Sequence, residues 1–180
     1  MNSQQKIHYW GNAFGLIVIC CLLIIAFVDQ IINYDLPCPL CLLQRVSFVG
    51  IGICFMLNLY SGIRPSHYGF MLLQTLIGLA ISTRQIYFHL GTNSPGYGNS
   101  ILGLYFYTWA AIIFTIIILC IAIALIFDHG FDEQYTVSSK FLTIVIALFL
   151  FLILANGIST VLECGFNSCP GNPTYYYLLK

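Results

Sequence analysis

Charged residues are scarce in this chain. Only 7% of its 180 residues are Asp, Glu, Lys or Arg, whereas 59% are hydrophobic. Soluble domains carry about 25% charged residues, so this composition excludes an ordinary soluble protein and indicates an integral membrane protein. The formal net charge is zero. A zero net charge argues against the basic surface that binding to nucleic acid requires, and no nucleic-acid partner is expected.

Long segments without charge mark the candidate membrane spans. A helix needs about 20 predominantly apolar residues to cross the bilayer. The sequence predicts five such helices, near residues 11–32, 42–61, 68–90, 103–127 and 141–161. The first follows Lys6, as the core of a signal peptide would. However, it is long, and the bulky residues around Cys20 and Cys21 offer no small-residue cleavage site. We therefore expect it to be retained.

The few cations indicate the orientation of the chain. Five spans place its two ends on opposite sides of the membrane. Lys6, Arg64 and Lys140 would share one side, whereas only Lys180 lies clear of the spans on the other. Because Lys and Arg collect in cytoplasmic loops, we expect the first side to be cytoplasmic. The segments then expected outside are 33–41, 91–102 and 162–180.

The eight cysteines divide into two groups of four. One group falls within the predicted spans, where a cysteine usually packs as a small apolar residue; its members are Cys20, Cys21, Cys54 and Cys120. The other group forms two close pairs on the expected outer side, where disulfides persist; the pairs are Cys38 with Cys41 and Cys164 with Cys169.

The first close pair stands at the mouth of the second predicted span. Cys38 is expected to be the N-cap residue, Pro39 the first helical residue and Cys41 the third. Cys41 would lie at the positive end of the helix dipole, with Arg45 one turn further along the same face. Both features favour a reactive thiolate. An arginine inside a span is costly and suggests function, although Arg45 could instead snorkel to the membrane surface.

The Cys-Pro-Leu-Cys-x-x-Gln-Arg block at 38–45 resembles the quinone-linked disulfide bond formation protein B family (DsbB). Three further stretches share this resemblance, which covers roughly residues 10–127. They are Asp29-Gln30 at the end of the first span, Arg84-Gln85-Ile86-Tyr87 near the end of the third, and Ile101-Leu102-Gly103-Leu104-Tyr105 with Trp109 at the entry to the fourth.

The resemblance implies an all-α membrane protein with a DsbB-type four-helix transmembrane bundle, here over residues 1–127. Residues 128–180 would add a cytoplasmic link, a fifth transmembrane helix and a periplasmic tail with two cysteines. The protein would lie in the bacterial inner membrane, with its redox cysteines on the periplasmic side.

The resemblance also implies an activity. The protein would be a thiol:disulfide oxidoreductase that reoxidises a periplasmic DsbA-like thioredoxin-fold oxidase and passes the electrons to ubiquinone or menaquinone. Cys41 would contact the quinone, and Cys38 would exchange with the other disulfide. Arg45 would stabilise the Cys41 thiolate and a quinone oxygen, and Arg84 would be a second quinone-binding residue.

The sequence departs from the family pattern at the second cysteine pair. The family carries it in the loop between the third and fourth spans, but residues 91–102 contain no cysteine. We hypothesise that Cys164 and Cys169 replace it. A structural staple is the rival interpretation, although closing so small a loop stabilises by only about 2 kcal/mol.

A zinc site is a third use of four cysteines, since two close pairs could form a tetrahedral site. Arg45 would repel the metal, and no metal is expected. The alternative function is accordingly a non-catalytic membrane subunit whose outer cysteines bind zinc or brace the structure.

Overall fold

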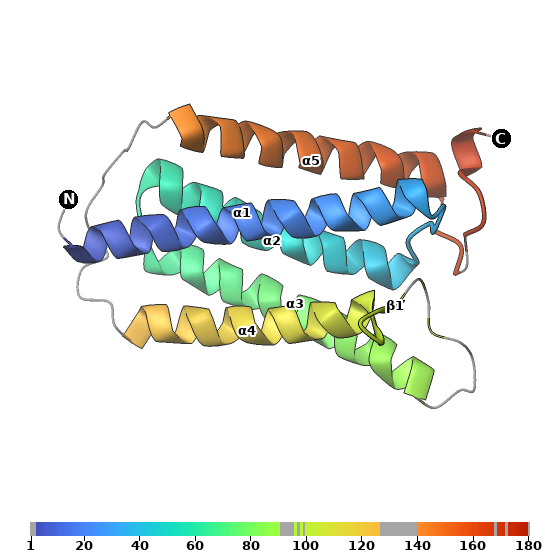
Figure 1. The fold of residues 1–180 in the computed structure, drawn as a ribbon, viewed down its shortest axis with the longest axis horizontal. Helices are drawn as coiled ribbons and strands as arrows, with labels where there is room; N and C mark the ends of the chain where they lie inside the picture. Colours follow the sequence, from blue (N-terminus) through green and yellow to red (C-terminus); the bar gives the residue numbers. More distant parts are fainter. Residues whose placement is uncertain are drawn as a thin grey trace.

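Five long helices run side by side in alternating directions in the computed structural model (Figure 1). The structure describes residues 3–90, 96, 98, 100–126, 140–167, 169–171 and 173–179. The long helices are α1 (Ser3–Ile32), α2 (Pro39–Ser61), α3 (Pro65–Leu90), α4 (Phe106–Ile126) and α5 (Lys140–Cys164). Strands β1 (Ser100–Ile101) and β2 (Leu104–Tyr105) pair as an antiparallel hairpin before α4, and the 3-10 helix η1 (Tyr177–Leu179) lies in the tail.

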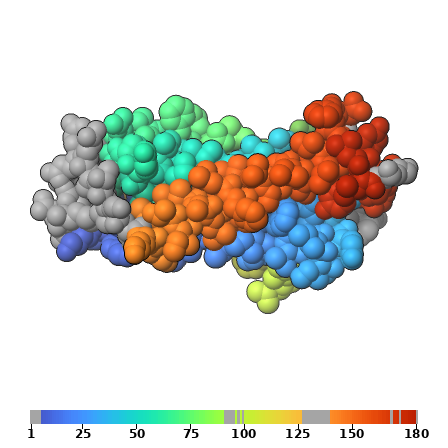
Figure 2. Space-filling model, turned by 90° about the horizontal axis from the view of Figure 1, so that it is seen from above, coloured from blue at the N-terminus to red at the C-terminus, as the bar shows by residue number. Residues whose placement is uncertain are grey.

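The helices pack mainly with their neighbours along the chain. α2 contacts both α1 and α3, α4 contacts α3, and α5 returns to pack on α1 and, to a lesser extent, on α2. Figure 2 shows α5 lying lengthwise over the bundle, with the tail folded over the end at which α1 finishes. The end of α5 therefore lies at the same end of the bundle as the start of α2 (Figure 1).

Phenylalanine side chains that pack against glycines of the neighbouring helices set the spacing of those helices. Phe149 of α5 lies where a Cβ atom on Gly52 of α2 would project, and Phe114 of α4 does the same at Gly78 of α3. Both phenylalanines are fully buried. The absence of a side chain at Gly52 therefore lets α5 approach α2 closely.

Four of the described helices are long and apolar enough to cross a membrane, namely α1, α2, α4 and α5. The protein is therefore an all-α multi-pass membrane bundle, as predicted. The helix expected at 68–90 is present as α3, but it does not reach the same apolar level. It carries Gln74, Arg84, Gln85 and His89. Five predicted helices are thus confirmed, whereas five crossings stay a prediction.

Three helices begin three to eight residues before the predicted spans, at Ser3, Pro39 and Pro65. Two other bounds also differ. The helix expected from residue 103 begins at Phe106, because Leu102 (φ 54°) and Gly103 (φ 79°) form the turn of the hairpin. The last helix extends past residue 161 to Cys164 and ends at Gly165, which has a φ of 64° and donates its N–H to the Val161 carbonyl at 2.8 Å. A left-handed glycine is a usual helix stop. Residues 128–139 of the predicted cytoplasmic link lie outside the described residues.

Candidate active site

A disulfide joins Cys38 and Cys41 at the start of α2, with their Cα atoms 5.0 Å apart. Cys38 is the N-cap residue, with extended backbone (φ −66°, ψ 159°), and Pro39 follows as the first helical residue. The Cys38 Sγ accepts the Cys41 backbone N–H at 3.1 Å. The local geometry predicted for this motif is thus present, and a thiolate formed here would meet free N–H groups.

Gln85 of α3 links both sulfurs to the bundle. Its Nε2 lies 3.3 Å from the Cys38 Sγ and 3.5 Å from the Cys41 Sγ, and donates to both. Its Oε1 accepts the Gln44 Nε2 at 2.9 Å, so each amide orients the other. Gln85 is only 1% exposed. The sequence interpretation missed it as a site residue, although a polar side chain in an otherwise apolar helix is a signal of function.

Arg45 points into the bundle. Its guanidinium donates to the Gln30 Oε1 at 2.7 Å and to the Ala26 carbonyl at 2.8 Å, both on α1. It also donates to the Asn156 Oδ1 of α5 at 3.3 Å. Three helices therefore meet at this side chain, and its contacts differ from those of an arginine that snorkels to the membrane surface. Gln30 and Asn156 were also missed, since nothing in the sequence pairs them with Arg45.

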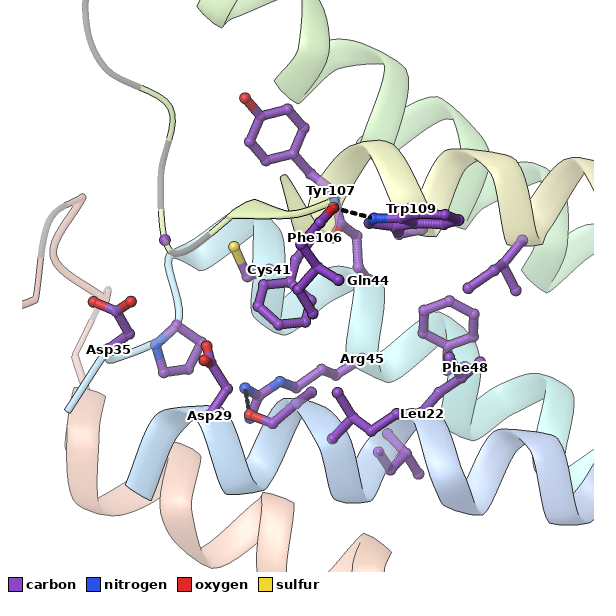
Figure 3. A pocket seen from close by; sticks show the side chains of 18 of the residues that line it. Leu22, Asp29, Asp35, Cys41, Gln44, Arg45, Phe48, Phe106, Tyr107 and Trp109 are labelled. Carbon is purple, nitrogen blue, oxygen red and sulfur yellow. Dashed lines mark hydrogen bonds between the residues drawn. The ribbon is translucent and has the colours of Figure 1, made fainter. Parts of the chain in front are cut away.

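A cavity of about 280 Å³ lies beside the disulfide, lined by α1, α2, α4 and the hairpin. Cys41, Gln44 and Arg45 of α2 supply polar groups to its wall, as do the carboxyl groups of Asp29 and Asp35 (Figure 3). Apolar side chains form most of the rest, including Phe106 of α4 and Phe48 of α2. Ligand pockets are usually apolar with a few placed polar groups, so this cavity suits a small, mostly apolar molecule.

A quinone head group fits the chemistry of these walls. The aromatic rings can lie against its faces, and Arg45 can donate to a carbonyl oxygen. Arg84, the other residue predicted to bind a quinone, is exposed, with its guanidinium 5.4 Å from the centre of the Phe88 ring. Arg84 is not one of the described residues that line the cavity. Its contact with a quinone stays a prediction.

The second pair, Cys164 and Cys169, is also joined as a disulfide, with Cα atoms 4.6 Å apart. Cys164 is the last residue of α5 and is buried. The tail beyond it returns to α1, where the Gln30 Nε2 donates to the Tyr176 hydroxyl at 2.9 Å and to the Ser159 hydroxyl at 2.8 Å. Gln30 therefore contacts Arg45, α5 and the tail together.

The remaining cysteines carry no disulfide. Cys20 and Cys54 are buried, whereas Cys21 and Cys120 are exposed on the apolar outer surface of α1 and α4. In the part of the chain that the structure describes, no three His, Cys, Asp or Glu side chains are grouped for a metal ion.

Comparison with known proteins agrees with this site. The family described as "Disulfide bond formation protein DsbB" matches residues 9–99, which is half of the chain. The chain belongs to the DsbB family. The match includes the Cys38–Cys41 pair, Arg45 and Gln85. The description of the family associates it with disulfide bond formation.

A DsbB relative in Marinobacter nauticus, a disulfide bond formation protein B, is 38% identical over 80 residues. These residues cover 41% of this chain and 48% of the relative, so the chain aligns with about half of the relative's length. No solved structure matches significantly. The helices α4 and α5 and the tail lie beyond the residues that match the DsbB family.

Proposed function

We propose that this protein is a quinone-dependent thiol:disulfide oxidoreductase of the bacterial inner membrane. It reoxidises a periplasmic DsbA-like thioredoxin-fold oxidase and passes the electrons to ubiquinone or menaquinone, which supports disulfide formation in folding proteins. The observation that carries this proposal is the disulfide whose Cys41 opens onto an apolar cavity that also holds the Arg45 guanidinium.

The two sulfurs take different roles. Cys38 exchanges with the incoming disulfide, and Cys41, which lines the cavity, is the sulfur from which electrons leave. A bound quinone would supply the acceptor for two electrons and two protons. The reduced Cys38–Cys41 pair gives up one electron pair as its disulfide forms again, and two protons accompany the electrons.

The neighbouring side chains support the reduced pair. Arg45 stabilises a Cys41 thiolate and binds a quinone oxygen, because one guanidinium serves both anionic partners. Gln85 donates to whichever sulfur carries the charge. Arg84 is kept as a proposed second quinone-binding residue on its resemblance to the family. A higher KM for quinone in Arg84→Ala would support that role, and an unchanged KM would contradict it.

The central test is anaerobic mixing of the reduced protein with a quinone, followed by counting of the remaining thiols. Two thiols of the Cys38–Cys41 pair should be lost for each quinone reduced. Cys41→Ser should abolish quinone reduction, whereas Cys38→Ser should leave a Cys41 thiolate that still perturbs the quinone spectrum. Quinone reduction at the normal rate in Cys41→Ser contradicts the assignment.

We further propose that Cys164 and Cys169 relay electrons from the partner to Cys38 and Cys41. In the disulfide form Cys38 is only 6% exposed, whereas Cys169 is half-buried and more accessible to a partner. The two pairs lie at the same end of the bundle (Figure 1). Thiol–disulfide exchange requires a mixed disulfide, so the relay requires a Cys169 or Cys164 thiolate to reach Cys38.

The relay is best tested with α5 kept in place, since Asn156 of α5 accepts a hydrogen bond from Arg45. The double variant Cys164→Ser/Cys169→Ser should lose oxidation of a DsbA-like partner. It should retain quinone reduction driven by a small dithiol. If the double variant oxidises its partner normally, the tail disulfide is only a structural staple.

A further inference from the structure

Glu163 is a buried carboxyl group that the proposed electron path does not use. Its side chain is 1% exposed, and neither carboxylate oxygen has a hydrogen-bond partner among the described residues. It lies in the last turn of α5, at the negative end of the helix dipole. A buried charge without compensation costs several kcal/mol, so a group with this placement needs a nearby cation.

Arg45 lies against the face of α5 that carries Glu163. Arg45 donates to Asn156, and its partner Gln30 donates to Ser159; Asn156, Ser159 and Glu163 follow one another by three and four residues, so they share one helix face. The other titratable groups around the guanidinium are Asp29, which lines the cavity with Arg45, and Tyr176, which accepts a hydrogen bond from Gln30. The hydrogen bonds of Arg45 go to neutral acceptors, the amide oxygens of Gln30 and Asn156 and the Ala26 carbonyl. The positive charge is therefore not neutralised by a direct ion pair among the described residues.

The two carboxylates near Arg45 differ in their surroundings. Asp29 is half-buried on the cavity wall and accepts the Asn33 side-chain amide at 2.7 Å, so its carboxylate has a hydrogen-bond donor and partial access to the surface. Glu163 has no such solvation. Glu163 is therefore the buried counter-charge of Arg45.

Reduction of the disulfide changes this balance. The Cys38–Cys41 disulfide carries no charge, but a Cys41 thiolate adds a second anion beside the same guanidinium. Two buried anions facing one cation would be costly. We propose that Glu163 takes up a proton when the Cys38–Cys41 pair is reduced and releases it when the pair is reoxidised. This proposal rests on the proposed exchange at Cys38–Cys41 and makes Glu163 a positioning residue that acts through Arg45.

The step balances. Two partner thiols supply one electron pair, which breaks the Cys38–Cys41 bond as the partner disulfide forms. One of their two protons goes to the Cys38 thiol and the other to the Glu163 carboxylate, while Cys41 remains a thiolate. On reoxidation the electron pair and both protons leave. Arg45 faces one buried anion in both states.

The proton count is measured from the pH dependence of the Cys38–Cys41 redox equilibrium. The full-length protein, free of quinone, is equilibrated with dithiol buffers, and the pair is followed by alkylation and mass spectrometry. The buffer dithiol releases two protons as it is oxidised, so the equilibrium constant changes tenfold per pH unit for each of these protons that the protein does not take up. Below the thiol pKa of the buffer, the wild type, which takes up two protons, should show a pH-independent equilibrium constant. Glu163→Gln, which takes up one, should favour the reduced pair tenfold more for each unit of rising pH, and Glu163→Asp should keep the wild-type behaviour.

Ser82→Ala is the matched control, because Ser82 of α3 is another buried polar side chain without a partner among the described residues, but it bears no charge. It should keep the pH-independent equilibrium of the wild type. An equal pH dependence in wild type and Glu163→Gln overturns the proposal.

A second measurement needs no variant. Infrared difference spectra of the wild type should gain a protonated-carboxyl band on reduction, and its absence also overturns the proposal. Because neither measurement uses quinone, failure of quinone reduction would contradict the proposed function and leave this test intact.

Discussion

Arg45 is the residue on which the site depends most, since it connects α1, α2 and α5 at the cavity wall. Arg45→Ala should raise the KM for quinone and lower the thiolate fraction of Cys41, each by about tenfold or more, because a hydrogen bond to a charged group contributes roughly 1.5–3 kcal/mol. Arg45→Lys should recover only part, as a point charge lacks the planar donor fork. Steady-state quinone kinetics and the rate of Cys41 alkylation measure the two effects.

Arg64→Ala is the control for this prediction. Arg64 is exposed and precedes α3 at the opposite end of the bundle, so its loss removes the same charge without touching the cavity. Unchanged quinone kinetics in Arg45→Ala would leave the arginine with a structural role only.

Gln85 gives a second prediction at the residue scale. Gln85→Leu removes the donor to both sulfurs and leaves the buried Gln44 amide without its partner, so the protein should lose about 1–3 kcal/mol of stability. Quinone turnover should also fall. The double variant Gln44→Leu/Gln85→Leu should regain stability but not turnover, because no amide is then left unpaired. Thermal unfolding and quinone kinetics separate the two; full turnover in either variant would contradict a role for Gln85 at the sulfurs.

Whether the role of a site residue could be predicted depends on how far along the chain its partners lie. The Cys38 cap, the Pro39 start and the Arg45 position follow from spacings within one helix turn. Gln85 and Glu163 gain their roles from partners on other helices, and a polar residue in an apolar run does not state which helix it will face. The sequence could indicate that such residues are functional, but it could not identify their partners or roles.

At the scale of elements, the position of α5 depends on one glycine. Gly52→Ala should force Phe149 and α5 away from α2, because the added Cβ would overlap the phenylalanine ring. Overpacking of this kind costs about 1–3 kcal/mol. Thermal unfolding should therefore shift downward, and Arg45 should lose part of its contact with Asn156, with slower quinone reduction.

Gly157→Ala is the matched control on α5, since nothing lies within 4 Å of a Cβ at that position. It should be neutral or stabilise by up to about 1 kcal/mol, the difference in helix propensity between the two residues. If Gly52→Ala were equally harmless, α5 would not be held by this contact. The sequence predicted α5 from its apolar run, but the hairpin was missed because apolar residues continue through the Leu102-Gly103 turn.

For the whole molecule, the open question is whether α3 crosses the membrane with its four more apolar neighbours. Five crossings place the N-terminus and C-terminus on opposite sides, as the bundle does with its two ends (Figure 1). An alkaline phosphatase fusion after Lys180 should therefore be active, and a fusion after Gly62 inactive. Equal activity of the two fusions would contradict the fifth crossing, and an active fusion after Gly62 with an inactive one after Lys180 would contradict the orientation.

The long segments without charged residues were sufficient to predict five helices and their order. A segment that lies in lipid must satisfy its backbone hydrogen bonds internally, and a helix does so. The hydropathy of α3 is lower because it carries polar residues, several of which face inward: Gln85 donates to the sulfurs, and Thr75 and Ser82 are fully buried. Composition alone cannot separate a helix with a polar inner face from one that stays outside the membrane.

The cavity is bordered by side chains that also reach the outer surface of the bundle, since Ile25 of α1 is 49% exposed and Ile101 of β1 is 43% exposed. A hydrophobic molecule dissolved in the bilayer would then enter sideways, without passing through water. The concentration that governs binding is in that case a mole fraction in lipid. Additional phospholipid, at fixed bulk concentrations of quinone and enzyme, should therefore slow quinone reduction, because it lowers the mole fraction of quinone in the lipid.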